Sequence, residues 1–349
     1  MESILEEFKK TFAVLFVVLM FLSIVVNVVC LMGLTRSYHK RRFRDYLFVS
    51  LNVCDILRVS LSTPLEVRGL LKHSSVETDE EHLCKPISFF IYMLEFTSIA
   101  HILIIVIDRY VCVCQPTIAL KIYLKRNRIY QAILLTYVNG FFWAVLPLLG
   151  LGSYGFQIDE IQCGLKALHD TNTKVYISLV LVLANGLPIM SSFACLFRIK
   201  KKFNQTSANI RVSKKSTTIE TDENMNGETS NNRGQKELLR YFSQDQRQFQ
   251  MVLTLILVFI VTWFLYDVIL FEEIFFADKP NVYLEILSNF VAHSSALVNP
   301  IIILYFCSDL RITLLKIKGL YVRRRRREIE NQNIPNTRSS VAQNDGDGL

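Results

Sequence analysis

The sequence predicts an all-α fold, a bundle of seven transmembrane helices. Of its 349 residues, 51% are hydrophobic and 20% are charged, a composition typical of a polytopic membrane protein. Seven stretches of mostly apolar residues are each about 20 residues long or longer, enough to cross a bilayer as a helix. Basic residues gather in alternate loops between these stretches, as they do on the cytoplasmic side of a membrane.

The seven spans occupy most of the chain up to residue 306. They run roughly over residues 11–34, 45–67, 86–112, 130–152, 175–199, 249–276 and 283–306. No internal sequence repeat relates the two halves, which argues against transporters built from repeated units. We therefore expect a short N-terminal extension over residues 1–10, one helical domain over 11–320 and a tail over 321–349.

The charges of the loops set the orientation of the chain. The loops after the first, third and seventh spans are basic, with Arg36, Lys40, Arg41, Arg42 and Arg44, then Lys121, Lys125, Arg126 and Arg128, then Arg311, Lys316, Lys318 and the arginines at 323–327. The opposite loops carry acids such as Glu77, Asp79 and Glu160. By the positive-inside rule the basic loops face the cytoplasm. We expect a multi-pass protein of the plasma membrane, surrounded by the lipid bilayer, with its N-terminus extracellular.

Two long polar segments lie on the cytoplasmic side. Residues 201–246 carry few large apolar side chains, so we expect most of that loop to be disordered, as we do the tail from about residue 328. Residues 308–327 alternate apolar and basic positions, which favours a short amphipathic helix on the anionic inner leaflet. The arginines at 323–327 suit a topology anchor, and no nucleic acid is expected as a partner.

Two of the eight cysteines fall on the extracellular side. Cys84 lies at the outer start of the third span, and Cys163 lies in the loop after the fourth. A disulfide can persist in that oxidising space, so we predict that these two cysteines are bonded. The other six are intramembrane or cytoplasmic and suit packing.

Short motifs occur in order along the spans, one in each. They are Asn27 in the first span, "LNVCD" ending at Asp55, "DRY" (Asp108, Arg109, Tyr110) in the third, Trp143, Pro188, "FIVTW" ending at Trp263, and "NP" (Asn299, Pro300) in the seventh. Each motif alone is weak, but all of them in this order are specific. Over residues 11–320 the chain closely resembles a rhodopsin-like G-protein-coupled receptor.

The resemblance implies a switch at the cytoplasmic end. It pairs Arg109 with Asp245 of the sixth span at rest, and outward motion of that span then opens a cleft for a heterotrimeric G protein. Asp245 and Trp263 lie five helical turns apart on one stripe. The alternative is that Asp245 is only a solvated residue near a helix start. The switch residues that the resemblance implies are Asp108, Arg109, Tyr110, Asp245, Phe259, Trp263, Asn299, Pro300 and Tyr305.

A polar cluster is expected in the membrane core. Charged and strongly polar groups are costly there, so Asp55 and Asn299 should face the bundle interior and have partners. In the resembling family, residues matching Asp55, Ser98, Ser295 and Asn299 form a hydrated sodium-binding cluster. An ordinary polar network is the alternative. Pro300 frees a backbone carbonyl one turn earlier, which allows the seventh span to bend.

The chain departs from the family at positions linked to activation. Leu265 stands where the sixth span usually kinks at a proline, and Leu196 stands where the fifth commonly has a tyrosine. In the seventh span Ile303 takes the place of the expected tyrosine, and Tyr305 comes two residues later. These departures keep open an atypical, weakly coupled or constitutively biased receptor.

Residues 147–165 and 292–302 look most like opsins. An opsin forms a retinal Schiff base through a lysine six residues before the Asn-Pro pair, and that position here is His293. Imidazole cannot form this linkage. The usual counter-ion positions hold Ile87 and Gln157, which are uncharged. We therefore expect no covalent retinal and no other cofactor beyond the sodium ion.

The predicted ligand pocket contains Ile91, Glu95, Trp263, Asp267 and His293. Ile91 stands where aminergic receptors have an aspartate, so a monoamine held in that way is not expected. Three alternatives stay open. They are a cationic small ligand held by Glu95 and Asp267, an internal glutamate–histidine pair that stabilises a ligand-free fold, and a noncovalent apolar ligand such as a retinoid.

Other classes of protein fit the sequence less well. A transporter or proton channel would also place acids in the membrane. An enzyme could use His293 with an acid, but the chain has neither a His-Glu-x-x-His zinc motif nor a Gly-x-Ser-x-Gly nucleophile motif. We expect a receptor and not an enzyme.

Overall fold

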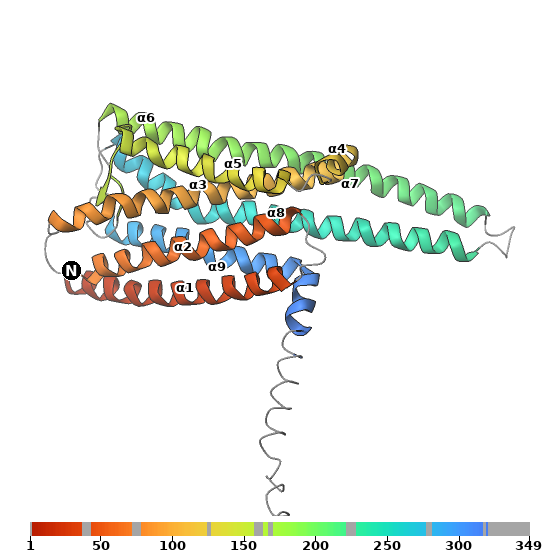
Figure 1. The fold of residues 1–349 in the computed structure, drawn as a ribbon, viewed down its shortest axis with the longest axis horizontal. Helices are drawn as coiled ribbons and strands as arrows, with labels where there is room; N and C mark the ends of the chain where they lie inside the picture. The colour runs from red at the N-terminus through yellow and green to blue at the C-terminus, as the bar shows by residue number, and fades with distance from the viewer. Residues whose placement is uncertain are drawn as a thin grey trace, which may run out of the picture.

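The computed structural model describes residues 2–36, 43–71, 78–123, 127–156, 163–166, 170–220, 228–276, 281–316 and 319. Within these ranges, seven helical runs are long and apolar enough to cross a membrane. They are Ser3–Arg36, Phe43–Leu71, Leu83–Cys114, Asn127–Leu149, Thr171–Asn209, Phe242–Glu273 and Val282–Phe306. Figure 1 shows these helices packed along one common direction. The predicted all-α bundle of seven spans is confirmed.

The elements follow the predicted spans in order. They are α1 (Glu2–Arg36), α2 (Phe43–Leu71), α3 (Thr78–Cys114), α4 (Pro116–Tyr123), α5 (Asn127–Val145), η2 (Leu146–Leu149), β1 (Tyr154–Phe156), β2 (Cys163–Leu165), α6 (Thr171–Leu179), η3 (Val180–Gly186), α7 (Leu187–Glu220), α8 (Glu228–Phe276) and α9 (Val282–Phe306). The fourth span is α5 with η2, and the fifth is α6, η3 and α7 together.

The fifth span changes its winding in the middle because of a proline. Pro188 has no backbone N–H and its ring crowds the carbonyl of the preceding turn, so the regular hydrogen-bond ladder cannot pass through it. The seven residues of η3 just before it are wound as a π-helix, and the Leu187 N–H donates to the Val182 carbonyl. Such π-turns recur at functional sites.

Three clusters of buried apolar side chains fill the described part of the bundle. The half of the bundle that contains Asp108 and Arg109 is called here the cytoplasmic half, after the orientation predicted from the sequence. It is packed around Leu47, Ile105, Ile199, Leu255 and Ile303, which come from five different spans. Because these contacts are non-directional, they hold the helices together without fixing one register. Large apolar side chains on the outward faces, such as Val261 and Phe197, are exposed as lipid-facing positions should be.

A short hairpin covers the outer end. Strands β1 and β2 pair antiparallel, with Tyr154 opposite Leu165. The Tyr154 hydroxyl donates to the Ala144 carbonyl at 2.9 Å, which fixes the hairpin on the fourth span. Cys163 is disulfide-bonded to Cys84 of α3, with Cα atoms 5.3 Å apart. The predicted disulfide is confirmed.

The cytoplasmic segments differ in part from the prediction of disorder. Residues 201–220 belong to α7 and residues 228–246 to α8, and both helices project beyond the others in Figure 1. Lys, Glu, Gln and Arg, which favour helix, make up about a third of residues 201–246. Residues 308–316 are helical, as predicted. The arginines at 323–327 and the rest of the tail lie outside the described residues.

Candidate functional site

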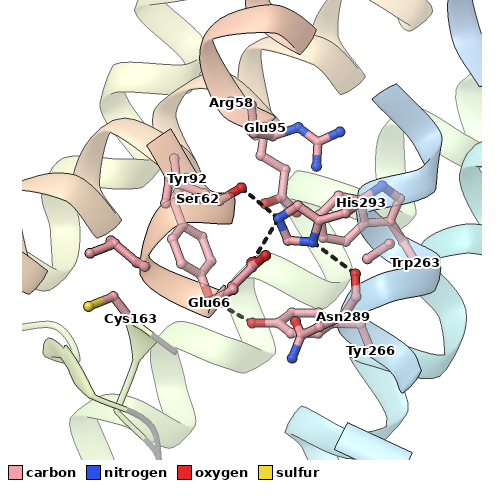
Figure 2. Close-up of a pocket in the computed structure, with 13 residues that line it drawn as sticks. Arg58, Ser62, Glu66, Tyr92, Glu95, Cys163, Trp263, Tyr266, Asn289 and His293 are labelled. Carbon is pink, nitrogen blue, oxygen red and sulfur yellow. Dashed lines mark hydrogen bonds and ion pairs between the residues drawn. The ribbon is translucent and has the colours of Figure 1, made fainter. Parts of the chain in front are cut away.

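A small cavity lies in the outer half of the bundle, lined by side chains of α2, α3, α8 and α9 (Figure 2). Its volume is about 40 Å³. That is room for water molecules, which need at least about 10–15 Å³ each by this measure, and far less than the roughly 300 Å³ at which ligand pockets begin. Ile91, Glu95, Trp263 and His293 line it as predicted.

Asp267, the fifth predicted pocket residue, is not among the lining residues. Its carboxylate lies near the side chain of Asn185 in η3. The π-wound turn before Pro188 therefore places a polar side chain beside this acid.

One face of α2 carries a stripe of four buried polar residues: Asp55, Arg58, Ser62 and Glu66, exposed by 1%, 3%, 3% and 6%. Steps of three and four residues place neighbours on one face of a helix, so the stripe runs from the middle of the span toward its outer end. The sequence analysis singles out only Asp55. The signal for the others was their 3-4-4 spacing together with two charges inside a membrane span.

His293 of α9 contacts the outer part of this stripe (Figure 2). Its Nε2 lies 2.8 Å from Ser62 Oγ and 3.0 Å from Glu66 Oε1, and its Nδ1 lies 2.8 Å from the Asn289 carbonyl oxygen. Both ring nitrogens are thus engaged, and the imidazole joins α9 to α2. His293 therefore pairs with Glu66, an acid that the sequence analysis does not single out, and not with Glu95 of the predicted pocket.

Arg58 occupies the middle of the stripe. Its Nη2 donates to Ser295 Oγ at 2.9 Å and lies 3.7 Å from Asp55 Oδ1. Its guanidinium carbon lies 5.6 Å from the centroid of the Trp263 ring, within the range of a cation–π contact. One buried cation therefore contacts α2, α8 and α9.

The four residues expected to bind sodium each contact other protein groups in this structure. Asn299 Nδ2 donates to Asp55 Oδ2 at 3.1 Å, and Ser98 Oγ donates to the Leu94 carbonyl at 2.9 Å. The Arg58 guanidinium already faces Asp55 and Ser295. Two like unit charges about 4 Å apart repel by about 4 kcal/mol at an effective dielectric constant of about 20. A second cation would meet that repulsion.

Glu95 is the pocket acid with the fewest partners. It makes no hydrogen bond to any residue that the structure describes, and its charged neighbours are Arg58 and Asp267. On the outer side of the cavity, the Tyr92 and Tyr266 hydroxyls lie 2.9 Å apart, and the dashed line between them in Figure 2 marks this contact. These tyrosines join α3 to α8 across the pocket.

No lysine lines the cavity in the part of the chain that the structure describes. Lys85 is exposed at the outer start of α3, and Ile87 is partly buried two residues further on. Gln157 lies outside the described residues. The absence of a retinal Schiff base stays a prediction.

At the cytoplasmic end of α3, Asp108 and Arg109 form a buried pair. Arg109 Nε donates to Asp108 Oδ2 at 2.9 Å, and the two residues are 6% and 7% exposed. The Tyr110 hydroxyl accepts from Arg198 of α7 at 3.4 Å. Asp245 is half-buried on α8, and its pairing with Arg109 stays a prediction.

The aromatic switch residues divide into inward and outward ones. Phe259 and Trp263 lie with ring centroids 6.1 Å apart on α8. Tyr305 is 67% exposed, whereas Ile303 is fully buried, because two residues correspond to about 200° around a helix. Tyr305 therefore does not fill the inward position expected of a switch tyrosine, and Ile303 does.

The seven spans, the outer hairpin tied to α3 and the buried Asp108–Arg109 pair define a seven-transmembrane receptor. The family described as the seven-transmembrane receptors of the rhodopsin family matches residues 9–303. The chain belongs to the rhodopsin family. It is a receptor and not an enzyme.

Relatives within the family are opsin-like. The visual pigment-like receptor peropsin of Mus musculus is 25% identical over 112 residues, which are 32% of this chain and 33% of that protein. Retinochrome of Todarodes pacificus is 28% identical over 104 residues, 29% of this chain and 32% of that protein. The matched stretches thus span about a third of these relatives. Squid rhodopsin has the same fold, with a TM-score of 0.74 and 17% identity over 91% of this chain and 87% of that one.

Proposed function

We propose that this protein is a plasma-membrane receptor, with its N-terminus outside, that relays occupation of the outer pocket to heterotrimeric G proteins through outward motion of α8. The observation that carries the proposal is the alignment of pocket and switch on shared helices. Glu95 and Arg109 lie 14 residues apart on α3, close to four turns. Trp263 lines the pocket on α8, and Asp245 lies 18 residues before it.

The pocket chemistry supports a small, noncovalent ligand that carries a cationic group. Glu95 faces the cavity without a hydrogen-bond partner among the described residues, whereas Glu66 and Asp55 already have partners. A ligand amine at Glu95 would supply the missing donor. Because the cavity holds only about 40 Å³, binding must separate Tyr92 from Tyr266 or move α8. Either motion would connect the ligand to the switch.

A retinoid bound without a covalent bond is the second candidate, favoured by the likeness to peropsin and retinochrome. The small cavity and the charged side chains around it argue against an apolar polyene. Incubation of the purified protein with 11-cis or all-trans retinal, followed by borohydride, should give no retinyl-lysine by mass spectrometry. A stoichiometric adduct with visible absorbance would instead show that the protein binds retinal covalently, as a photopigment does.

Nucleotide exchange tests the proposed coupling. The purified receptor in lipid nanodiscs is mixed with each class of heterotrimeric G protein, and guanine-nucleotide exchange is followed with a panel of small amines and with buffer alone. Faster exchange than with empty nanodiscs, for at least one G protein, supports the proposal. Ion or proton flux in reconstituted vesicles without any exchange would favour the transporter or channel alternative.

A further inference from the structure

We propose that the Arg58 guanidinium is the resident cation of the polar cluster beneath the pocket, and that this cluster therefore takes no sodium ion. The cluster consists of Asp55, Arg58, Ser295 and Asn299. The proposal concerns the resting stability of the protein and does not depend on the coupling proposed above.

The charges of the cluster already balance. Asp55 and Arg58 are 1% and 3% exposed, and one turn of α2 brings Arg58 Nη2 to 3.7 Å from Asp55 Oδ1. A buried carboxylate without a counter-charge is strongly destabilising. Here the counter-charge is covalently attached to the same helix, so no ion from solution is required.

Two of the oxygens that a sodium ion would need, Ser295 Oγ and Asp55 Oδ2, are already hydrogen-bonded. Hard cations take several oxygen ligands at once. Ser295 Oγ accepts from Arg58 and donates to the Ala292 carbonyl at 2.7 Å. Asp55 Oδ2 accepts from Asn299 at 3.1 Å. The remaining carboxylate oxygen, Oδ1, faces the guanidinium. An entering ion would have to displace Arg58 from both oxygens.

The position of Arg58 also gives it a role that a diffusible ion cannot have. The same guanidinium lies over Trp263 of α8 at 5.6 Å and is the cationic neighbour of Glu95 in the pocket. A sodium ion can leave when such a cluster collapses, but Arg58 cannot. Movement of α8 must therefore carry Trp263 off the guanidinium or reorient the side chain as a unit.

Thermal unfolding in matched salts tests the proposal on the full-length protein in detergent or nanodiscs. The Tm is measured during titration with sodium chloride and, at equal ionic strength, with choline chloride. The wild-type curves should coincide, since no site takes sodium selectively. A saturable increase in the wild-type Tm that sodium gives and choline does not would overturn the proposal.

Variants at position 58 separate the guanidinium from the rest of the cluster. Arg58→Leu and Arg58→Gln remove the charge, so Asp55 needs an external cation, and sodium should now raise the Tm by a few degrees over choline. Arg58→Lys keeps a tethered cation and should stay insensitive. Adding Asp55→Asn to Arg58→Gln should abolish the new response. A folded Arg58→Gln protein without any sodium response would show that Arg58 is not what excludes the ion.

A second measurement keeps the proposal testable if neither charge-removing variant folds. Sodium-23 NMR relaxation of the wild-type protein reports selective sodium binding directly. A relaxation change that saturates with sodium concentration, and that other monovalent ions do not reverse, would contradict the proposal. A linear, choline-sensitive response, typical of a diffuse ion atmosphere, would support it.

Discussion

The outer and cytoplasmic halves of the bundle are held together by different interactions. In the outer half, directional contacts join separate elements: His293 to Glu66, Arg58 to Ser295, and the Cys84–Cys163 disulfide. In the cytoplasmic half, the Asp108–Arg109 pair joins adjacent residues of one helix, Arg198 of α7 donates to Tyr110 of α3 at 3.4 Å, and a large apolar cluster fills the space between spans. Apolar contacts can be exchanged for similar ones at small cost, whereas a directional contact is either made or broken.

This difference assigns a role to each half. The outer half fixes the relative positions of α2, α3 and α9 around the pocket. Under the coupling proposed above, the cytoplasmic half would move by repacking Leu255 or Ile303 against new apolar neighbours. Trp263 of α8 contacts Arg58 in the outer half. A motion that starts at Trp263 would therefore displace the cytoplasmic end of α8.

Arg109 should give the largest effect on function. Arg109→Ala removes a buried cation at the cytoplasmic end of α3, so nucleotide exchange should fall to the rate seen without receptor. Arg109→Lys keeps the charge but not the planar fork of donors and should recover only part of the activity. Arg36→Ala, at an exposed position at the cytoplasmic end of α1, is the control. Normal exchange by a well-expressed Arg109→Ala protein would remove this residue from the switch.

The disulfide should give the largest effect on stability in the outer half. Cys84→Ser opens a cross-link between residues 79 positions apart, and loss of a native disulfide typically costs about 2–4 kcal/mol. The Tm should fall, and mass spectrometry without reduction should show Cys163 as a free thiol. Cys195→Ser, at a free cysteine on α7, should leave the Tm nearly unchanged. Equal losses at both positions would indicate that the cross-link itself contributes little.

The His293–Glu66 contact should give a smaller effect in the same half. Glu66→Leu takes away one partner of a buried imidazole, which typically costs about 1–3 kcal/mol. Glu66→Gln keeps a hydrogen-bonding group at that place and should lose less. Glu272→Gln, at an exposed acid near the outer end of α8, should change the free energy of unfolding by less than about 0.5 kcal/mol. A Glu66→Leu protein as stable as the wild type would mean that Ser62 and Asn289 alone hold His293.

The sequence predicts the parts of this architecture that depend on local composition. The seven spans follow from the length of the apolar runs, and the Cys84–Cys163 bond follows from the side of the membrane on which both lie. The stripe on α2 was within reach, because Arg58 and Glu66 are charged residues in a span. The spans are recognised from the average hydrophobicity of each apolar run, and such an average hides single charged residues within the run.

The sequence could not predict which side chains contact each other across helices, for a different reason. His293 contacts Glu66 because of the way α9 packs on α2. Asp267 lies near Asn185 and does not line the cavity because of the π-wound turn before Pro188. No local pattern contains these packing angles. The helical extension of α7 and α8 into residues 201–246 was likewise missed, since polar composition alone does not distinguish a solvated helix from a disordered loop.

Asp170 should give the smallest effect, and its pH dependence distinguishes it from the other outer contacts. It precedes α6, and its side chain accepts from the Thr173 N–H at 3.2 Å and from the Thr173 hydroxyl at 2.7 Å. These hydrogen bonds to the ionised form, chiefly that from the Thr173 hydroxyl, lower the pKa of Asp170 from its ordinary value of 3.8.

A folded-state pKa below the unfolded-state value means that the cap stabilises the fold fully above about pH 3.8 and loses this contribution as the pH falls through the lower, folded-state pKa. Asp170→Asn retains a capping side chain but cannot titrate, so its Tm should equal that of the wild type near neutral pH and fall less on acidification below pH 3.8. Asp170→Ala should lower the Tm at neutral pH, and it should also remove the part of the fall in Tm below pH 3.8 that Asp170 causes. If the Asp170→Asn and wild-type proteins lose stability in parallel below pH 3.8, acid sensitivity of the outer half must come from other carboxylates.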